Sequence, residues 1–276
     1  MGLQPPAVDD VLVTFPTPQI MLVTINRAAA MNAITRPMHT QLDILWRWYD
    51  AQPSLRCALL TGTGRAFCAG ADLKEWDDKN TKGIKSSGDD RDRGWKGSGF
   101  GGLSNRRSKK PIVGAVNGLC LGGGMEIALN LDMIIASEGA KFGLPEVKIG
   151  VVAIAGALPR LIRTVGRQRA SEMALLGRMY TAKEMEAWGV VNKIVPAKEV
   201  LKEALKWAAE VSGNSPDSVI VTMAGLLGGW DGEDPVSSTN RVDEGIYRQL
   251  DGGENQKEGV KSFVEKRKPV YRDSKL

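Results

Sequence analysis

Short β-branched runs alternate with helical segments along most of the chain, and this alternation limits the fold more than any other feature. Runs typical of strands occur at residues 11–15, 20–25, 57–62, 112–116, 133–137 and 190–195. Apolar residues recur at helical spacing in the segments between them, at residues 36–50, 155–165 and 168–176. Thr181 and Glu184 add a capping box for a further helix. This alternation is typical of a mixed α/β body.

The pattern changes after Pro196. Three helical segments follow without a strand between them, at residues 198–211, 217–230 and 256–267. A chain of 276 residues can bury the core of one large domain, with or without an appendage. We therefore expect an α/β body over residues 1–196 and an all-helical region over residues 197–276.

Residues 75–108 form a polar, glycine-rich insertion with neither helical nor strand periodicity, and we expect a mobile loop there. Its large aromatic residues are Trp76, Trp95 and Phe100. These rings can pack as a lid over an apolar ligand, or they can simply pin a surface loop. The sequence leaves both interpretations open.

The chain carries 37 Lys and Arg against 32 Asp and Glu, a formal net charge of +5. Such a mild excess is compatible with an anionic ligand and does not require nucleic acid. The basic run at residues 104–110 raises one remote alternative, an inactive RNA-binding or assembly protein. Because an aromatic-rich nucleic-acid motif is absent, we do not expect nucleic acid as a partner. We expect this run, and the tail residues Lys266, Arg267 and Lys268, to be solvated.

Metal sites and redox cofactors have little support in the sequence. The three cysteines are widely spaced and His39 is the single histidine, so we expect buried thiols and no metal. Cys68 lies in a glycine-rich turn, but it lacks a neighbouring histidine to activate it as a nucleophile. The segment GLCLGGG fits a dinucleotide fingerprint poorly, so we expect no cofactor. No run reaches the roughly 18 apolar residues of a membrane span.

The two ends of the chain differ in their match to known targeting signals. Residues 1–10 lack the apolar core of a signal peptide and the arginine-rich character of a mitochondrial presequence. The last three residues, Ser274, Lys275 and Leu276, form the tripeptide that the peroxisomal import receptor reads. We expect import into peroxisomes; the alternative is a solvated tail that no receptor reads.

Two glutamates have a local context unlike that of surface charge. Glu126 follows the triple glycine of LGGGME and starts an apolar helical segment, and Glu146 follows a proline in FGLPEVKIG. A chain with one histidine must move protons mainly through carboxylates, Lys, Tyr or Cys. Burial in these surroundings raises the pKa of a carboxyl towards neutral pH. The pair is therefore our candidate for acid/base chemistry.

Five segments carry a family resemblance: INRAAAMNAI (25–34), GRAFCAGADLKE (64–75), KPIVGAVNGLCLGGGMEIAL (110–129), FGLPEVKIG (142–150) and EGVKSFVEKRKPVY (258–271). They resemble the enoyl-CoA hydratase/isomerase, or crotonase, family over nearly the whole chain. The resemblance implies a spiral of ββα units and a C-terminal helical region that forms trimers, often paired as hexamers. It also implies an acyl-CoA substrate, with coenzyme A present only as part of that substrate.

The same resemblance implies roles for particular residues. Ala71 and Gly123 match the positions whose backbone N–H groups form an oxyanion hole, and Glu126 and Glu146 match the two catalytic glutamates. The positions that match coenzyme A contacts are Ala69, Asp72, Leu73, Lys74, Phe263 and Lys266. The last two match a pair in the family's tail that reaches coenzyme A, often from a neighbouring subunit.

The implied reaction is the reversible hydration of a 2-enoyl-CoA to a 3-hydroxyacyl-CoA, in fatty-acid β-oxidation or a specialised acyl-CoA pathway. A double-bond isomerase can use the same oxyanion hole with one carboxylate and is the nearest alternative. The chain departs from the family where Ala28 replaces a proline and where Ala153 and Ile154 replace proline and glycine. We expect Ile154 to line the acyl pocket, and the acyl group itself stays open.

Overall fold

The computed structural model describes residues 3–81 and 97–276. The predictions of a mobile loop and of a role for Trp95 therefore fall, for residues 82–96, outside the described residues. Among the described residues, no helix is both long and apolar enough to cross a membrane.

Two sheets organise the body. The larger has the strand order β1-β2-β3-β5-β7-β10, and the smaller has the order β4-β6-β8-β9. The larger sheet contains β1 (Val11–Thr17), β2 (Ile20–Ile25), β3 (Cys57–Gly62), β5 (Ile112–Val116), β7 (Met133–Ser137) and β10 (Lys193–Val195). The smaller sheet contains β4 (Ala66–Cys68), β6 (Leu119–Leu121), β8 (Lys141–Gly143) and β9 (Met179–Thr181).

Successive strands alternate between the two sheets. The chain passes from β3 to β4, from β5 to β6 and from β7 to β8, so each turn places one strand in each sheet. The pairs β3–β5, β5–β7, β4–β6 and β6–β8 are all parallel. Consecutive repeats of this two-strand unit therefore stack on one another, and the carboxyl ends of β4 and β6 lie side by side.

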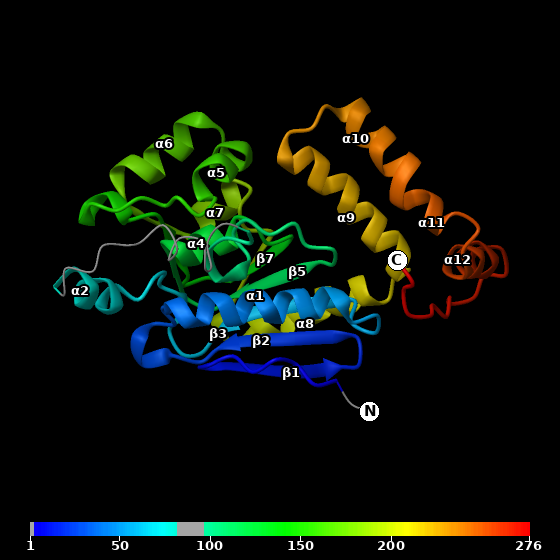
Figure 1. The fold of residues 1–276 in the computed structure, drawn as a ribbon, viewed down its shortest axis with the longest axis horizontal. Helices are drawn as coiled ribbons and strands as arrows, with labels where there is room; N and C mark the ends of the chain where they lie inside the picture. The colour runs from blue at the N-terminus through cyan, green and yellow to red at the C-terminus, as the bar shows by residue number, and fades with distance from the viewer. Residues whose placement is uncertain (1–2, 82–96) are drawn as a thin grey trace.

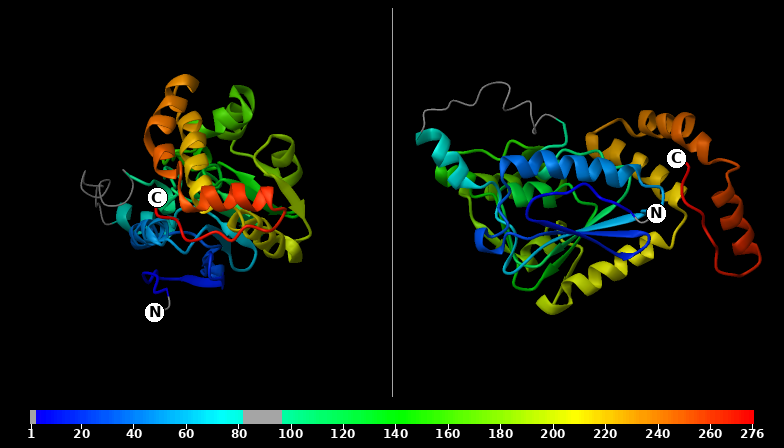
Figure 2. Two further views of the ribbon diagram at one scale, coloured as in Figure 1. Left: turned by 90° about the vertical axis from the view of Figure 1, so that its right-hand side faces the viewer. Right: turned by 60° about the horizontal axis from the view of Figure 1, so that its bottom comes forward.

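Helices cover both faces of the larger sheet. Helix α1 (Arg36–Ala51) packs on one face and α8 (Val200–Ser212) on the other, and Figure 2 shows the sheet between them. Along β3, Ala58 and Leu60 join the cluster under α1, whereas Cys57 and Leu59 join the cluster under α8. A strand buried on both faces reads as a continuous apolar run, which is why β3 was predicted with its observed bounds.

The remaining helices flank the body and extend it. Beside it lie α2 (Leu73–Thr81), α4 (Gly123–Ala128), α5 (Ala157–Val165), α6 (Arg167–Leu176) and α7 (Ala182–Ala187). The C-terminal helices are α9 (Pro216–Asp231), α10 (Pro235–Val242), α11 (Arg248–Leu250) and α12 (Glu254–Val264). They project away from the sheets, so that α12 lies at the opposite end of the molecule from α2 (Figure 1). The prediction of helices alone after Pro196 is confirmed among the described residues.

Two local predictions are wrong. Only Lys193–Val195 of the expected strand at residues 190–195 joins the sheet, because the N–H groups of Val190 and Val191 bond Met185 O at the end of α7. The insertion is not irregular throughout, since α2 occupies part of it. Of the two interpretations of Phe100, the structure agrees with the pin, because its side chain is 1% exposed and anchors this end of the insertion in the main core.

The basic run at residues 104–110 is not a solvated patch. Arg106 is buried and pairs with Asp50 (Nη2 to Oδ2, 2.6 Å). Lys110 is also buried, and its ammonium donates to the carbonyl oxygens of Tyr49 and Gln52. These two charges serve the fold, so the run does not form the continuous exposed basic surface that the RNA-binding alternative needs. Lys266, Arg267 and Lys268 are exposed, as predicted.

The C-terminal tripeptide is held against the body. Ser274 is buried, and its hydroxyl donates to Asp217 at the start of α9. The ammonium of Lys109 donates to the carbonyl oxygen of Leu276. The interpretation of a solvated tail is therefore wrong for Ser274. Lys275, which lies between Ser274 and Leu276, is exposed.

Candidate active site

The backbone N–H groups of Ala71 and Gly123 lie on neighbouring segments just after β4 and β6 end. Ile34 and Ala71 form an isolated parallel bridge, in which Ile34 N–H donates to Gly70 O (2.9 Å) and Asp72 N–H donates to Ile34 O (3.1 Å). In this pattern the N–H of Ala71 itself points away from Ile34, towards the opposite side of its strand. Gly123 opens α4, where N–H groups have no acceptor within the helix. Within residues 3–81 and 97–276, neither N–H forms a hydrogen bond.

Glycines allow these two segments to approach closely. Gly70 has a φ of +99°, and a Cβ placed on it would lie 3.0 Å from Gly123 N. Gly122 has a φ of +55°, and a Cβ there would lie 3.3 Å from Glu146 Oε1. Both positions are in the left-handed region that glycine adopts without strain. The triple glycine therefore brings the N–H groups and a carboxyl group to one place, as backbone geometry requires for an oxyanion hole.

Glu126 lies in the first turn of α4 and is 3% exposed. One carboxyl oxygen, Oε2, accepts a hydrogen bond from Ala157 N–H (3.1 Å) at the start of α5. The pKa of Glu126 is raised to about 7, mainly by burial. The charge of Glu146 adds to this increase, whereas the backbone N–H groups of Ala157 and Ala155 and the charge of Arg160 oppose it. At neutral pH the carboxyl can both give up and take up a proton.

Glu146 begins the 3-10 helix η3 (Glu146–Ile149), just after β8. Its side chain is half-buried, and burial raises its pKa. The oxygen Oε2 is buried and makes no hydrogen bond to any described residue. Buried carboxyl oxygens almost always have a partner, so this atom is suited to receive a water or substrate proton.

The two carboxyls interact, because the charge on Glu146 adds to the increase in the pKa of Glu126. Burial is the first cause of the raised pKa of both groups. With a pKa of about 7, Glu126 exchanges a proton near neutral pH, and a second carboxyl near it can take the opposite role when water adds to a double bond.

The residues expected to contact coenzyme A divide into two groups. Ala69, Asp72, Leu73 and Lys74 adjoin Ala71 at the start of α2. The carboxylate of Asp72 pairs with Arg27 (3.0 Å) and accepts Lys74 N–H (3.2 Å), so it fixes the turn, while the side chains of Leu73 and Lys74 are exposed.

Phe263 and Lys266 are not brought to this group within one chain. Phe263 lies on α12 and is 85% exposed, and Lys266 follows the end of that helix. Helix α12 and helix α2 lie at opposite ends of the longest axis (Figure 1).

Ile154 lies in the loop between η3 and α5. This loop leads to Ala157, whose N–H binds Glu126, but the side chain of Ile154 is 70% exposed. Its neighbours Ala153 and Ala155 are buried, as is Gly156. The role of Ile154 in an acyl pocket stays a prediction.

His39 and the cysteines have no direct part in this site. Burial lowers the pKa of His39 to about 4, so the ring is neutral, and its Nδ1 accepts Gly101 N–H (2.9 Å). All three cysteines are buried and free, as predicted, and burial raises the pKa of Cys68 to about 12. A thiol in that state is a poor nucleophile. In the described ranges, no group of three His, Cys, Asp or Glu could hold a metal ion.

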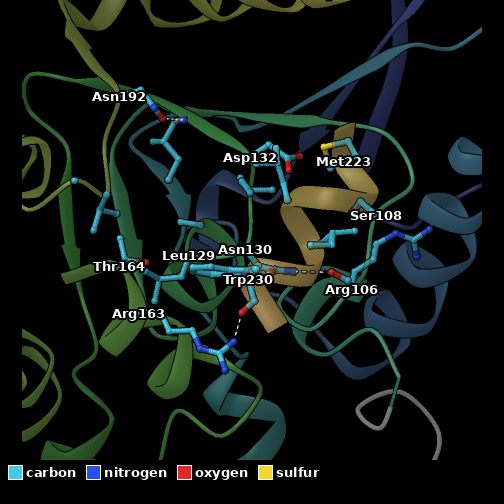
Figure 3. A pocket seen from close by; sticks show the side chains of 18 residues that line it. Arg106, Ser108, Leu129, Asn130, Asp132, Arg163, Thr164, Asn192, Met223 and Trp230 are labelled. Atoms are coloured by element: carbon cyan, nitrogen blue, oxygen red, sulfur yellow. Dashed lines mark hydrogen bonds between the residues drawn. The ribbon is translucent and has the colours of Figure 1, made fainter. Parts of the chain in front are cut away.

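A cavity of about 560 Å³ lies at the other end of α4 and contains neither catalytic candidate. Figure 3 shows Arg106, Asn130, Asp132, Arg163 and Trp230 around it. Its polar groups already serve the fold: Asn130 donates to the carbonyl oxygens of Leu103 and Arg106, and Asp132 accepts Ile112 N–H. We therefore place the active site at the two glutamates.

Sequence reasoning missed the groups that hold the site from behind. Ala157 acts through its backbone N–H, and its side chain gives no signal. Phe100 and Ser104 were read as parts of a polar insertion and a basic run, although both are fully buried. Their positions in the glycine-rich sequence offered no periodic pattern from which burial could be inferred.

Comparisons with known proteins agree on one family. Residues 17–274 match the family model of enoyl-CoA hydratase/isomerase. A mevalonyl-coenzyme A hydratase from Beauveria bassiana is 70% identical, covering 99% of this chain and 98% of the relative. One from Aspergillus fumigatus is 48% identical, covering 98% of each. The solved enoyl-CoA hydratase of Mycobacterium tuberculosis is 31% identical with a TM-score of 0.84, covering 96% of this chain and 99% of that structure.

The raised pKa of Glu126 makes a prediction about stability. Its folded-state pKa of about 7 exceeds the ordinary 4.5, so the folded protein binds this proton more tightly than the unfolded chain. The contribution of this proton to the free energy of unfolding is fully present below pH 4.5, and it is lost as the pH rises to about 7. Glu126→Gln avoids that loss. At pH 8 we therefore expect the free energy of unfolding of this variant to exceed that of the wild type by at most about 3 kcal/mol.

Denaturant unfolding at pH 8 and pH 4.5 measures the effect. Glu138→Gln, at an exposed position, is the matched control. The wild type and both variants share the other titrating groups, whose contributions therefore cancel when the free energies of unfolding are subtracted. Equal pH dependence for both variants would show that Glu126 is not destabilised by burial.

Proposed function

Because the chain belongs to the enoyl-CoA hydratase/isomerase family, we propose that it reversibly adds water across the C2–C3 double bond of a 2-enoyl-CoA thioester. The product is a 3-hydroxyacyl-CoA. One observation carries this proposal: two coupled carboxyls lie beside two backbone N–H groups that make no hydrogen bond within the described residues. Coenzyme A is part of the substrate, and no other cofactor enters the proposal.

The N–H groups of Ala71 and Gly123 bind the thioester oxygen. As the oxygen of water bonds to C3, the electron pair of the double bond moves towards the thioester, and negative charge gathers on its oxygen. Two fixed donors aimed at that oxygen stabilise the charge without reorganisation. Loss of one such donor typically raises the barrier by about 3 to 4 kcal/mol.

The carboxyls move the protons. The ionised member of the pair takes a proton from water while the water oxygen bonds to C3, and the protonated member delivers its proton to C2. The elements of water are added, and the pair ends with one proton, now on the other carboxyl. Because Glu126 has a pKa of about 7, it can act in either direction near neutral pH.

The relatives suggest the acyl group. Two of them are named mevalonyl-coenzyme A hydratases, at 70% and 48% identity. We propose mevalonyl-CoA as the hydrated species, with a hydroxyl and a methyl group on C3. Its dehydrated partner is 5-hydroxy-3-methylpent-2-enoyl-CoA. Mass analysis of products from this thioester and from unbranched 2-enoyl-CoAs distinguishes it from a general hydratase.

Isomerisation is the nearer alternative reaction on the same site. It needs a single carboxyl to carry a proton between C2 and C4. The second carboxyl, Glu146, has a buried oxygen without a partner among the described residues, and this favours hydration. Supplying a 3-enoyl-CoA and finding a 2-enoyl-CoA that does not gain water would favour the isomerase instead.

We propose that the chain works as a homotrimer or homohexamer in which Phe263 and Lys266 bind the coenzyme A of a neighbouring subunit. The separation of α12 from α2 within one chain supports this proposal (Figure 1). The exposure of Phe263 together with Val260 and Val264 on α12 supports it as well, because apolar side chains that gather on the surface often mark an interface.

We also propose import into peroxisomes through Ser274, Lys275 and Leu276. The hydroxyl of Ser274 bonds Asp217, and the carbonyl of Leu276 accepts from Lys109, so these contacts must open before a receptor can take up the tripeptide.

Removing either carboxyl tests the proposed reaction. We expect Glu126→Gln and Glu146→Gln to lower kcat by about 10²- to 10⁴-fold, because general acid–base catalysis contributes a factor of that size. The loss of enoyl-thioester absorbance measures the rate, and Glu138→Gln serves as the control. Undiminished turnover in both variants would refute the assigned roles.

A mixing experiment tests the shared site. We expect Phe263→Ser to raise KM about tenfold with little change in kcat, because the contact helps to bind coenzyme A in both ground and transition states. Co-expression of this variant with Glu126→Gln forms mixed oligomers, in which some sites combine an intact Glu126 with a neighbour's intact Phe263. Part of the activity should then return with the wild-type KM. A mass in solution equal to the single chain of 29.8 kDa would contradict the proposal.

Localisation is tested with a fluorescent protein fused to the N-terminus. We expect punctate fluorescence that overlaps a peroxisomal marker, and diffuse fluorescence after deletion of Leu276, since the receptor reads the complete tripeptide. Lys268→Ala, at an exposed position outside the tripeptide, should behave as the wild type. An unchanged distribution after the deletion would rule the signal out.

A further inference from the structure

The ring of Phe100 lies directly against the backbone of Gly123. A Cβ placed on Gly123 would come within 2.4 Å of the ring Cζ and 2.5 Å of Cε1 and Cε2. Contacts this short are impossible for a real Cβ, so the ring fills the space in which any other residue would carry its side chain. Phe100 is 1% exposed, and its position therefore limits where the N–H of Gly123 can lie.

His39 holds the turn that carries this ring. The two rings meet edge to face, with centroids 4.5 Å apart and an interplanar angle of 76°. The Nδ1 atom of His39 accepts Gly101 N–H, which requires that nitrogen to be unprotonated. The single histidine of the chain thus supports the site from within the core.

Ser104 connects this turn to the opposite side of the site. Its hydroxyl accepts Phe100 N–H (2.6 Å) and donates to the carbonyl oxygen of Ala155 (2.6 Å). Ser104 is completely buried, so no solvent replaces these bonds. Ala155 lies in the loop that leads to Ala157, whose N–H binds Glu126. One hydroxyl therefore joins the segment behind Gly123 to the segment that orients Glu126.

We propose that Ser104 is a positioning residue for the reaction, because its hydroxyl keeps the N–H of Gly123 and the carboxyl of Glu126 in fixed relation. The inference rests on the proposed function of these two groups. Catalytic donors and proton carriers must be held to a fraction of an ångström, and the residues behind them provide that restraint. Ser104 itself does not reach the reacting atoms.

Ser104→Ala removes both hydrogen bonds and tests the proposal. We expect kcat to fall by about 10- to 100-fold with KM nearly unchanged, since a misplacement of about 1 Å costs a factor of this order. The alkaline limb of the pH profile of kcat/KM should move above pH 7, because a displaced Ala157 N–H no longer lowers the pKa of Glu126. The other charges acting on Glu126, those of Glu146 and Arg160, are retained.

A second measurement needs no turnover. Butyryl-CoA labelled with carbon-13 at the thioester carbonyl binds without a double bond to react, and infrared difference spectroscopy reports how strongly its carbonyl is polarised. We expect the carbonyl stretch to lie below its solution value in the wild type and to move back towards that value in Ser104→Ala. Phe100→Leu keeps the serine bonds but loses the ring, so it should shift the carbonyl stretch and leave the alkaline limb unchanged.

Ser137→Ala is the matched control, because Ser137 is a buried serine at the end of β7 whose hydroxyl accepts Gly139 N–H. It should retain the wild-type kcat, pH profile and carbonyl stretch. Wild-type values of all three in Ser104→Ala would overturn the inference, as would an equal loss in Ser137→Ala. If the wild type polarises the carbonyl but does not turn over enoyl-CoA, the proposed reaction is wrong, while the carbonyl stretches of the variants still decide the role of Ser104.

Discussion

The structure depends on one constraint: where the smaller sheet ends, the N–H groups of Ala71 and Gly123 have no acceptor among the residues that the structure describes. The parallel pairing of β4 with β6 brings Cys68 opposite Cys120, so the segments that follow leave the sheet side by side. The bridge to Ile34 fixes Ala71, and the ring of Phe100 fixes Gly123. Strands, turn and core ring therefore act together on a pair of backbone donors.

Burial links the fold to the proposed chemistry. The packing that seats α4 also removes water from Glu126, and this desolvation is the main cause of its raised pKa. Burial also raises the pKa of Glu146, and the charge of Glu146 adds to the increase in the pKa of Glu126. Glu126, a group that is ordinarily ionised at neutral pH, can thus exchange a proton there. The cost in stability and the capacity for acid/base catalysis arise from the same burial.

The sequence predicted the family, the α/β body and the strands of the larger sheet, because buried strands such as Cys57–Gly62 are continuous apolar runs. It missed the four strands of the smaller sheet, because each has three residues and so short a run shows no periodic pattern. It failed where burial depends on distant partners. Arg106 and Lys110 look like surface charge until Asp50 and the end of α1 are placed beside them. Phe100 has no periodic neighbours, and its place follows only from packing against His39 and Gly123. The roles of the site residues rest on the resemblance and on the geometry together.

A crystal structure of the protein with a bound, unreactive acyl-CoA tests the central claim most directly. The account predicts that the thioester oxygen lies within about 3 Å of the nitrogen atoms of both Ala71 and Gly123. It also predicts that C2 and C3 face Glu126 and Glu146. A thioester oxygen away from these amides, or an acyl chain in the cavity lined by Asn130 and Trp230, would contradict it.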